Sequence, residues 1–271
     1  MSVPVEDAGL QTLLTQVERD RGLLLRSYKD RCLRRRLAVR MRARGVHTFF
    51  EYAALLGRSP EEYDLLVTAL AINVTKFFRN PEAYAVLRER VVAPLWERGG
   101  PVRVWSAGCA SGEEPYSLAL LFHDVAGERA GAVRGRVRID ATDLDPGALD
   151  DLRRAEYRAP AVEDVPPPLR ARYFSAGPPY RLDPRIAACV RPRLHDLTRD
   201  PPPDPPYDLI VCRNVVIYFD RPAQERLFGV YADALVPGGH LLLGKVEALF
   251  GPVRQRLVLE DARERLYRRP S

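Results

Sequence analysis

Apolar residues along the first 80 positions recur at the spacing of helices. Leu10, Leu13 and Val17 fall on one helix face, so the remaining positions of that segment face water. Ser59 is a candidate N-cap, and Pro60 occupies the first position of the helix that follows it. We expect an N-terminal all-α domain over residues 1–80 and a linker helix over residues 81–98. The helices of the all-α domain are expected near residues 10–21, 29–44 and 48–56 and from residue 60 onward.

From residue 99 onward the pattern changes to short apolar runs that alternate with helical segments. Strand candidates are Val102–Trp105, Val137–Thr142, Tyr207–Cys212 and Leu241–Leu243. Strands that alternate with helices are typical of parallel sheets covered on both faces. The pattern therefore predicts an α/β fold with a doubly wound, mostly parallel sheet over residues 99–271.

One stretch interrupts this alternation. More than half of the 24 prolines lie between Pro160 and Pro206. We interpret residues 158–195, approximately, as a small inserted β subdomain, with short strands near Tyr180–Leu182 and Val190–Leu194. A proline-rich loop is expected after it, from Asp200 to Pro206.

Composition narrows the class of protein. The chain has 271 residues, of which 46% are hydrophobic, and no apolar run approaches the roughly 20 residues of a membrane span. The N-terminus lacks the basic start and apolar core of a signal peptide, so we expect a cytoplasmic protein without membrane insertion. The four cysteines and four histidines are scattered, which predicts reduced thiols and no metal site.

The net charge of +6 is concentrated in one expected helix. Between Lys29 and Arg44 there are eight Lys or Arg residues and one Asp. Such a stripe is most often a solvated face, but it also suits nucleic acid or an acidic protein surface. The sequence pattern alone leaves these three alternatives open.

A glycine-containing turn follows the first expected strand. The segment Ser106–Gly112 contains neither Gly-x-Gly-x-x-Gly nor Gly-Lys-Ser/Thr, and Glu113 and Glu114 after it would repel a pyrophosphate. Asp143, at the end of the second expected strand, is placed to accept hydrogen bonds from ribose hydroxyls. A ligand with a ribose and a positive charge fits this set, which indicates S-adenosylmethionine. The alternative is a helix N-terminus with surface acids.

Four motifs in register make the interpretation more specific, because together the chain closely resembles the CheR-type protein-glutamate O-methyltransferases that act on chemotaxis receptors. The motifs are Asn73-x-Thr75-x-Phe77-Phe78-Arg79, Val104–Ala107 with Ser111–Ser117, Thr142–Asp145 and Cys212–Asp220. The resemblance implies a class I methyltransferase-like fold with S-adenosylmethionine as cofactor and S-adenosylhomocysteine as product. It also implies methyl esters on glutamates of the cytoplasmic helices of chemoreceptors, formed during chemotaxis adaptation.

The resemblance also implies roles for individual residues. Arg79 and Tyr218 would be the catalytic residues nearest the transferable methyl group, and the basic helix would dock on the receptor through Arg34, Arg35 and Arg42. The sequence departs from the family at Gly244–Glu247, where Gly-His-Ser-Glu is common and Gly-Lys-Val-Glu stands here. The implied cofactor-binding residues are Asn73, Thr75, Arg79, Gly108, Glu114, Asp143, Asp196, Leu197, Arg213 and Asn214.

Methyl transfer to a carboxylate needs little acid–base chemistry. A glutamate with a pKa near about 4.3 is already ionised at neutral pH, so no general base is required. Arg79 would orient the incoming carboxylate with paired N–H donors, and Tyr218 would shape the methyl pocket. As alternatives, Tyr218 is a core tyrosine and Arg79 a surface residue, while Phe77 and Phe78 are expected in the core.

Three other functions compete with this one. Asp204-Pro205-Pro206-Tyr207 matches a tetrapeptide of amino-methylating DNA enzymes, but it precedes its strand and would lie at the edge opposite the glycine turn. We therefore expect no nucleic-acid partner. A protein-carboxyl methyltransferase in a non-motility pathway and a non-catalytic cofactor-binding module also remain as alternatives. We expect a monomer.

Overall fold

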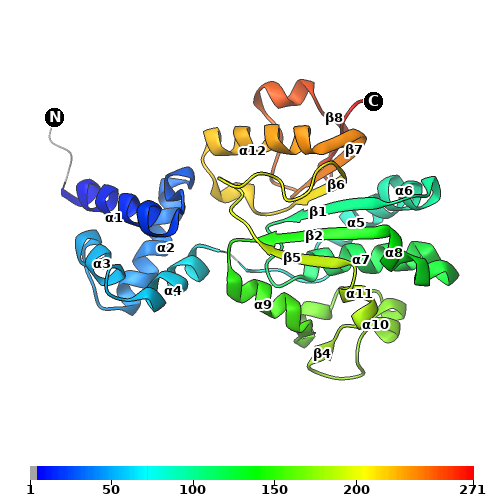
Figure 1. Ribbon diagram of the computed structural model, residues 1–271, viewed down its shortest axis with the longest axis horizontal. Helices are drawn as coiled ribbons and strands as arrows, with labels where there is room; N and C mark the ends of the chain where they lie inside the picture. Colours follow the sequence, from blue (N-terminus) through cyan, green and yellow to red (C-terminus); the bar gives the residue numbers. More distant parts are fainter. Residues whose placement is uncertain (1–4, 72) are drawn as a thin grey trace. The chain divides into compact units, whose positions relative to one another are not determined.

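The computed structural model describes residues 5–71 and 73–271, and the chain divides into two compact units (Figure 1). The first contains Met1–Ile72 together with Tyr218–Gln224. The second contains Asn73–Ile217 and Glu225–Ser271. Within the described ranges, none of the helices has both the length and the apolar character needed to cross a bilayer.

The first unit is helical, as its periodicity predicts. Leu33, Leu37 and Met41 form the buried stripe of the basic helix. Thr48 caps the next helix in a capping box with Glu51, which satisfies otherwise unpaired N–H groups. The helices are α1 (Val5–Arg21), α2 (Asp30–Ala43), α3 (Phe49–Leu56) and α4 (Pro60–Leu70), with a 3₁₀ turn at Leu25–Ser27 and Ser59 as the N-cap of α4.

A buried carboxylate ties α2 to α4. The side chain of Glu62 is fully buried and accepts hydrogen bonds from Arg40 at 2.8 Å and from the Tyr52 hydroxyl at 2.8 Å. Arg44 lies 3.2 Å from the same carboxylate. Burial alone would raise the pKa of Glu62, but the hydrogen bonds from Arg40 and Tyr52 outweigh burial and lower it. Part of the positive charge of α2 therefore stabilises its own unit.

The second unit contains a seven-stranded sheet in the order β5-β2-β1-β6-β7-β9-β8. The first five are parallel, and β9 and β8 add an antiparallel edge. Every residue of β6 is buried, which shows that both sheet faces are covered. The strands are β1 (Val102–Ala107), β2 (Val137–Asp143), β5 (Val190–Leu194), β6 (Tyr207–Cys212), β7 (Leu235–Leu243), β8 (Val258–Asp261) and β9 (Leu266–Arg268).

Helices connect these strands, so the predicted doubly wound α/β class is confirmed. A helical rod precedes β1 as α5 (Pro81–Leu87), a π-helical turn (Arg88–Val92) and α6 (Ala93–Arg98). The connecting helices are α7 (Glu113–Ala126), α8 (Val133–Arg136), α9 (Pro146–Arg154) and α12 (Arg221–Ala234). Short 3₁₀ helices are Gly127–Ala132, Ala159–Val162, Val216–Tyr218 and Gly251–Gln255.

The prediction for Val190–Leu194 was wrong. This segment is β5, which pairs in parallel with β2 at the edge of the main sheet, and it is no strand of the insertion. Pro192 fits there because an edge strand has one side without ladder hydrogen bonds. The inserted sheet has only the antiparallel strands β3 (Glu156–Tyr157) and β4 (Tyr180–Arg181), accompanied by α10 (Pro167–Tyr173) and α11 (Pro184–Ala187).

The strand order places a topological switch point between β1 and β6. The chain moves outward from β1 to β2 and β5 and then returns to form β6 and β7 on the other side of β1. In open α/β sheets, ligands bind outside the carboxyl ends of the strands at such a point. The turns after β1, β2 and β6 are therefore where a ligand is expected.

Candidate functional site

The turn after β1 lies tightly against its neighbours. Gly108 has φ +83°, and its N–H donates to the carbonyl oxygen of Thr142 at 2.8 Å. A Cβ at this position would come within 2.5 Å of a methyl carbon of Val215, in the turn after β6. Both the backbone angle and the close approach require glycine here.

Asp143, the last residue of β2, holds the glycine turn in place. Its carboxylate accepts the N–H of Ala110 at 2.8 Å and the N–H of Asp145 at 3.0 Å. Burial raises the pKa of Asp143, and the two N–H groups oppose that rise. Each carboxylate oxygen has a second lone pair, so the group retains capacity to accept ligand hydroxyls.

Glu114 is a buried acid in the first turn of α7. Its Oε1 accepts a hydrogen bond from the hydroxyl of Ser106 at 2.8 Å. Burial raises the pKa of Glu114 to about 7, although the positive charges of Arg213 and Arg79 lower it. A ligand with a positive charge would favour the ionised form of this carboxyl group.

Arg213 follows β6 and is also buried. Its Nη2 donates to Oδ1 of Asn80 at 2.9 Å, and its guanidinium lies 5.6 Å from the ring centre of Tyr84. Its Nε, by contrast, has no hydrogen-bond partner within the described part of the chain. The next residue, Asn214, has φ +60°. An unpartnered buried donor at a predicted ligand edge is available to a ligand acceptor.

Glu247, in the loop after β7, is a residue of this edge that the sequence did not identify as part of the site. It is 3% exposed, and its carboxylate accepts the N–H groups of Asn214, Val215, Ile217 and Gly244. Burial raises the pKa of Glu247, while these N–H groups oppose the rise. The one signal in the sequence was the glutamate of the Gly-Lys-Val-Glu motif.

The segment Asn73–Arg79 belongs to the same unit as the sheet. Asn73 Nδ2 donates to Oδ2 of Asp145 at 2.7 Å, which joins the segment to the turn after β2. Arg79 Nη1 donates to the carbonyl oxygen of Val74 at 2.9 Å, so the loop closes on itself and other guanidinium N–H groups remain for a ligand. Thr75 is half-buried.

The side chains of Phe77 and Phe78 fix this segment to the hydrophobic core. They are 0% and 4% exposed, which confirms the expectation that both are core residues. Phe77 packs edge-to-face on Tyr157 and Phe174 of the inserted region. The insertion therefore supports the loop that carries Asn73 and Arg79.

Asp196 and Leu197 follow β5. His195 N–H donates to the carbonyl oxygen of Asp143 at 2.9 Å, which brings the start of this loop to the end of β2. Asp196 Oδ1 accepts both the N–H and the hydroxyl of Thr198, so this oxygen stabilises its own turn. Leu197 is half-buried.

The structure does not place Tyr218 in the same unit as Arg79. Tyr218 lies in the stretch that clusters with the helical unit, where its carbonyl oxygen accepts the N–H of Lys29 at 2.9 Å. Phe219 packs edge-to-face on Tyr28, with ring centres 5.1 Å apart. The Tyr218 side chain is only half-buried, which argues against the alternative of a core tyrosine.

The three arginines predicted for docking differ in their surroundings. Arg34 is paired with Asp30 at 2.9 Å and with Asp7 at 2.6 Å. Arg35 and Arg42 are exposed and form no ion pair with another described residue. Of the three, these two present the free positive charge.

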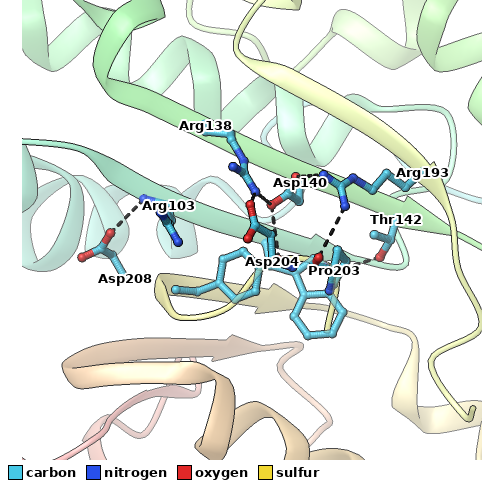
Figure 2. A network of polar contacts seen from close by, with 10 residues as sticks. Arg103, Arg138, Asp140, Thr142, Arg193, Pro203, Asp204 and Asp208 are labelled. Carbon is cyan, nitrogen blue, oxygen red and sulfur yellow. Dashed lines mark hydrogen bonds and ion pairs between the residues drawn. The ribbon is translucent and has the colours of Figure 1, made fainter. Parts of the chain in front are cut away.

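The Asp204–Tyr207 tetrapeptide has partners of its own. Figure 2 shows Arg138 between Asp140 and Asp204, with Arg193 on the other side of Asp140. The Tyr207 hydroxyl donates to Asp140 at 3.2 Å, and the tetrapeptide leads into β6, whose first residue is Tyr207. Its polar groups therefore fasten a loop to the sheet at the start of the strand, away from the turns after β1 and β6.

The residues at the carboxyl ends of β1, β2 and β6 fit a cofactor with a cation and a ribose. Glu114 offers a buried carboxylate to a cation, Asp143 offers acceptors to a diol, and Arg213 offers an unpartnered donor. No group of three His, Cys, Asp or Glu side chains that could hold a metal ion is found among residues 5–71 and 73–271.

Family models match nearly all of the chain. The model described as "CheR methyltransferase, SAM binding domain" matches residues 73–264. The model described as "CheR methyltransferase, all-alpha domain" matches residues 8–71. The first match alone covers more than half of the 271 residues.

Curated relatives agree over most of their length. A chemotaxis protein methyltransferase of Listeria innocua is 36% identical over 238 residues, which cover 87% of this chain and 88% of the relative. One of Klebsiella aerogenes is 34% identical, with 90% of this chain and 84% of the relative covered. One of Escherichia coli is 30% identical over 94% of this chain and 89% of the relative. With its helical N-terminal domain and class I methyltransferase fold, this chain belongs to the CheR methyltransferase family.

Proposed function

We propose that this protein transfers the methyl group of S-adenosylmethionine to glutamate side chains of chemoreceptor cytoplasmic helices. The products are a glutamate methyl ester and S-adenosylhomocysteine. The observation that supports this most directly is the buried Glu114 beside Ser106 at the switch point, because a buried carboxyl group with a raised pKa favours a cationic ligand when it ionises. Family membership supports the same chemistry.

The predicted cofactor residues would each bind a different part of S-adenosylmethionine. Glu114 would bind the positively charged amino-acid part, and Asp143 the ribose hydroxyls, while Asn73, Thr75 and Gly108 would line the ligand. Asp196, Leu197 and Asn214 would complete the contacts with their half-buried side chains, and Arg213 with its unpartnered Nε–H group. When bound, the sulfonium supplies an electrophilic methyl group and a good leaving group.

Catalysis in this proposal rests on orientation. The substrate glutamate is ionised at neutral pH, so the protein need not remove a proton. Arg79 would hold the incoming carboxylate through guanidinium N–H groups not used by Val74. Tyr218 would shape the space around the methyl group. Fixing the reacting atoms and excluding water then lowers the barrier.

Docking would use the exposed part of the basic helix. Arg35 and Arg42 carry unpaired positive charge within the described residues, whereas Arg34, on the same helix, is paired. Acidic helices of a receptor match this charge. Complementary charge would speed encounter and orient the substrate helix.

The test is methylation with methyl-labelled S-adenosylmethionine and receptor cytoplasmic fragments, followed by alkali. We expect volatile labelled methanol from the receptor fragment and none from DNA or RNA. Arg79→Ala and Tyr218→Ala should abolish transfer while S-adenosylhomocysteine binding partly survives. Label that is stable to alkali, or label on nucleic acid, would disprove the proposal. Unchanged transfer in both variants would disprove the two catalytic roles.

A further inference from the structure

The loop after β7 and the turn after β6 meet at a single carboxylate. Oε1 of Glu247 accepts the N–H of Val215 at 3.0 Å and that of Ile217 at 3.3 Å. Oε2 accepts the N–H of Gly244 at 2.6 Å and that of Asn214 at 3.0 Å. Each oxygen thus has two backbone donors, and three of the four donors belong to the turn after β6.

Among the described residues, no positively charged side chain pairs with this carboxylate. Glu247 is 3% exposed and forms no ion pair with any residue in the described part of the chain. A buried carboxylate is costly unless hydrogen bonds satisfy it, so the four N–H groups carry the stabilisation. Gly244 contributes by its size, because a Cβ there would lie 2.6 Å from Oε2 of Glu247.

The turn that Glu247 holds presses on the glycine turn. Val215 fills the space that a Cβ on Gly108 would occupy, at 2.5 Å. Asn214 has φ +60°, in the left-handed region that asparagine adopts more readily than most other residues. The N–H bonds of Asn214 and Val215 to Glu247 hold the turn in this conformation.

We propose that Glu247 is a positioning residue of the cofactor site, which fixes the Asn214–Ile217 turn against Gly108 without touching the cofactor. The inference rests on the proposed function, since it assumes that this edge binds S-adenosylmethionine. The Glu247 carboxylate connects the loop after β7 to all three amides of this turn.

Glu247→Gln isolates this role, because the amide is the same size as the carboxylate. Whichever way the side chain is oriented, its NH₂ group faces two backbone donors, so one pair of hydrogen bonds is lost. Val246→Ser is the matched control, since Val246 is the neighbouring residue and is 76% exposed. Both variants and the wild type are compared as full chains.

The first readout is S-adenosylhomocysteine affinity by calorimetry, and the second is hydrogen exchange of the amides of Asn214, Val215 and Ile217. We expect Glu247→Gln to lose about tenfold or more in affinity and to exchange these amides faster, and Val246→Ser to match the wild type. In turnover, the KM for S-adenosylmethionine should rise more than kcat falls. A general loss of folded protein would instead lower kcat without changing KM.

Unchanged affinity in Glu247→Gln overturns the inference, whether or not exchange is faster. If that variant fails to fold, Val215→Ala tests the same link from its other end. A weaker affinity in the folded Val215→Ala protein supports the inference, and an unchanged affinity overturns it. If the wild type itself fails to bind S-adenosylhomocysteine, the proposed function falls, and exchange alone decides whether Glu247 holds the turn.

Discussion

At the scale of single residues, Glu114 gives the site a pH dependence near neutrality. Its pKa of about 7 in the free protein results from burial, with Arg213 opposing. Because the folded-state value lies above the ordinary 4.5, this group reduces stability as pH rises from 4.5 to about 7. A bound cation favours the ionised form, so it offsets that loss.

The affinity for S-adenosylhomocysteine should therefore rise with pH as the carboxyl group of Glu114 ionises. Between pH 6 and 8 the ionised fraction of a group with a pKa of about 7 grows roughly tenfold, and we expect a similar gain in affinity by calorimetry. Glu114→Gln should bind more weakly with a flat profile over the same range. The ligand's own amino group titrates equally in both proteins. A variant that keeps the wild-type profile would rule out Glu114 as the cation-binding group.

Gly108 offers a second prediction at this scale. In Gly108→Ala the new methyl group would clash with Val215, and the residue would be strained at φ +83°. We expect a loss of cofactor affinity of about tenfold or more, since the clash of roughly 1–3 kcal/mol must be relieved by moving one of the two turns.

Gly131→Ala is the matched control, because nothing lies within 4 Å of a Cβ there. Titration calorimetry with S-adenosylhomocysteine measures both variants beside the wild type. Equal affinities for all three proteins would show that the contact between Gly108 and Val215 does not shape the site.

The sequence assigned Gly108, Glu114 and Asp143 to the expected ligand edge because each lies at the end of a recognisable strand or at the start of the helix that follows it. It did not predict Glu247, because three of the four backbone N–H groups that it accepts lie about 30 residues earlier in the chain. Backbone donors leave no mark on side-chain identity. Only the folded turn shows that a carboxylate is needed there.

At the scale of elements, strands with continuous apolar runs were predicted well and edge strands poorly. Tyr207–Cys212 matches β6 at both ends because every residue is buried. Val190–Leu194 alternates Arg with apolar residues and contains Pro192, so its pattern did not distinguish an edge strand from an insertion. Similarly, β7 begins at Leu235 and runs through Pro237–Gly239, where the pairing with β6 shifts register.

The basic helix carries paired arginines and exposed, unpaired ones, and a count of charges in the sequence does not distinguish the two kinds. Arg40 and Arg44 bind the buried Glu62, and Arg34 binds two aspartates, whereas Arg35 and Arg42 are exposed. If the helix docks on acidic receptor helices, the exposed pair should contribute most. Paired arginines would have to give up a partner to bind.

We therefore predict that the double variant Arg35→Ala, Arg42→Ala raises the KM for a receptor fragment about three- to tenfold at low salt. The difference should shrink at high salt, and S-adenosylhomocysteine affinity should stay unchanged. Arg34→Ala serves as the control, with a smaller change in KM. Initial rates at varied receptor concentration measure all three. An equal or larger effect of Arg34→Ala would contradict this division of the helix.

At the scale of the whole molecule, the chain joins its two units at more than one point. After β6 it leaves the sheet, contributes Tyr218–Gln224 to the helical unit and returns within α12. In the helical unit this stretch is held by Lys29 N–H on Tyr218, by Asp220 N–H on Ser27 at 2.8 Å, and by the Tyr28–Phe219 ring contact. The helical unit thus sets the backbone position of Tyr218, while the predicted cofactor residues all belong to the other unit.

This division predicts that a substitution outside Tyr218 and the cofactor residues can reduce methyl transfer without affecting cofactor binding. Tyr28→Ala removes one ring of the edge-to-face pair, whose centres are 5.1 Å apart, and so loosens the stretch that carries Tyr218. We expect kcat for receptor methylation to fall several-fold while calorimetry shows unchanged S-adenosylhomocysteine affinity. Tyr28→Phe keeps the ring and should restore kcat. A fall in both quantities in Tyr28→Ala would mean that this contact supports the fold as a whole, and an unchanged kcat would mean that the position of Tyr218 does not govern transfer.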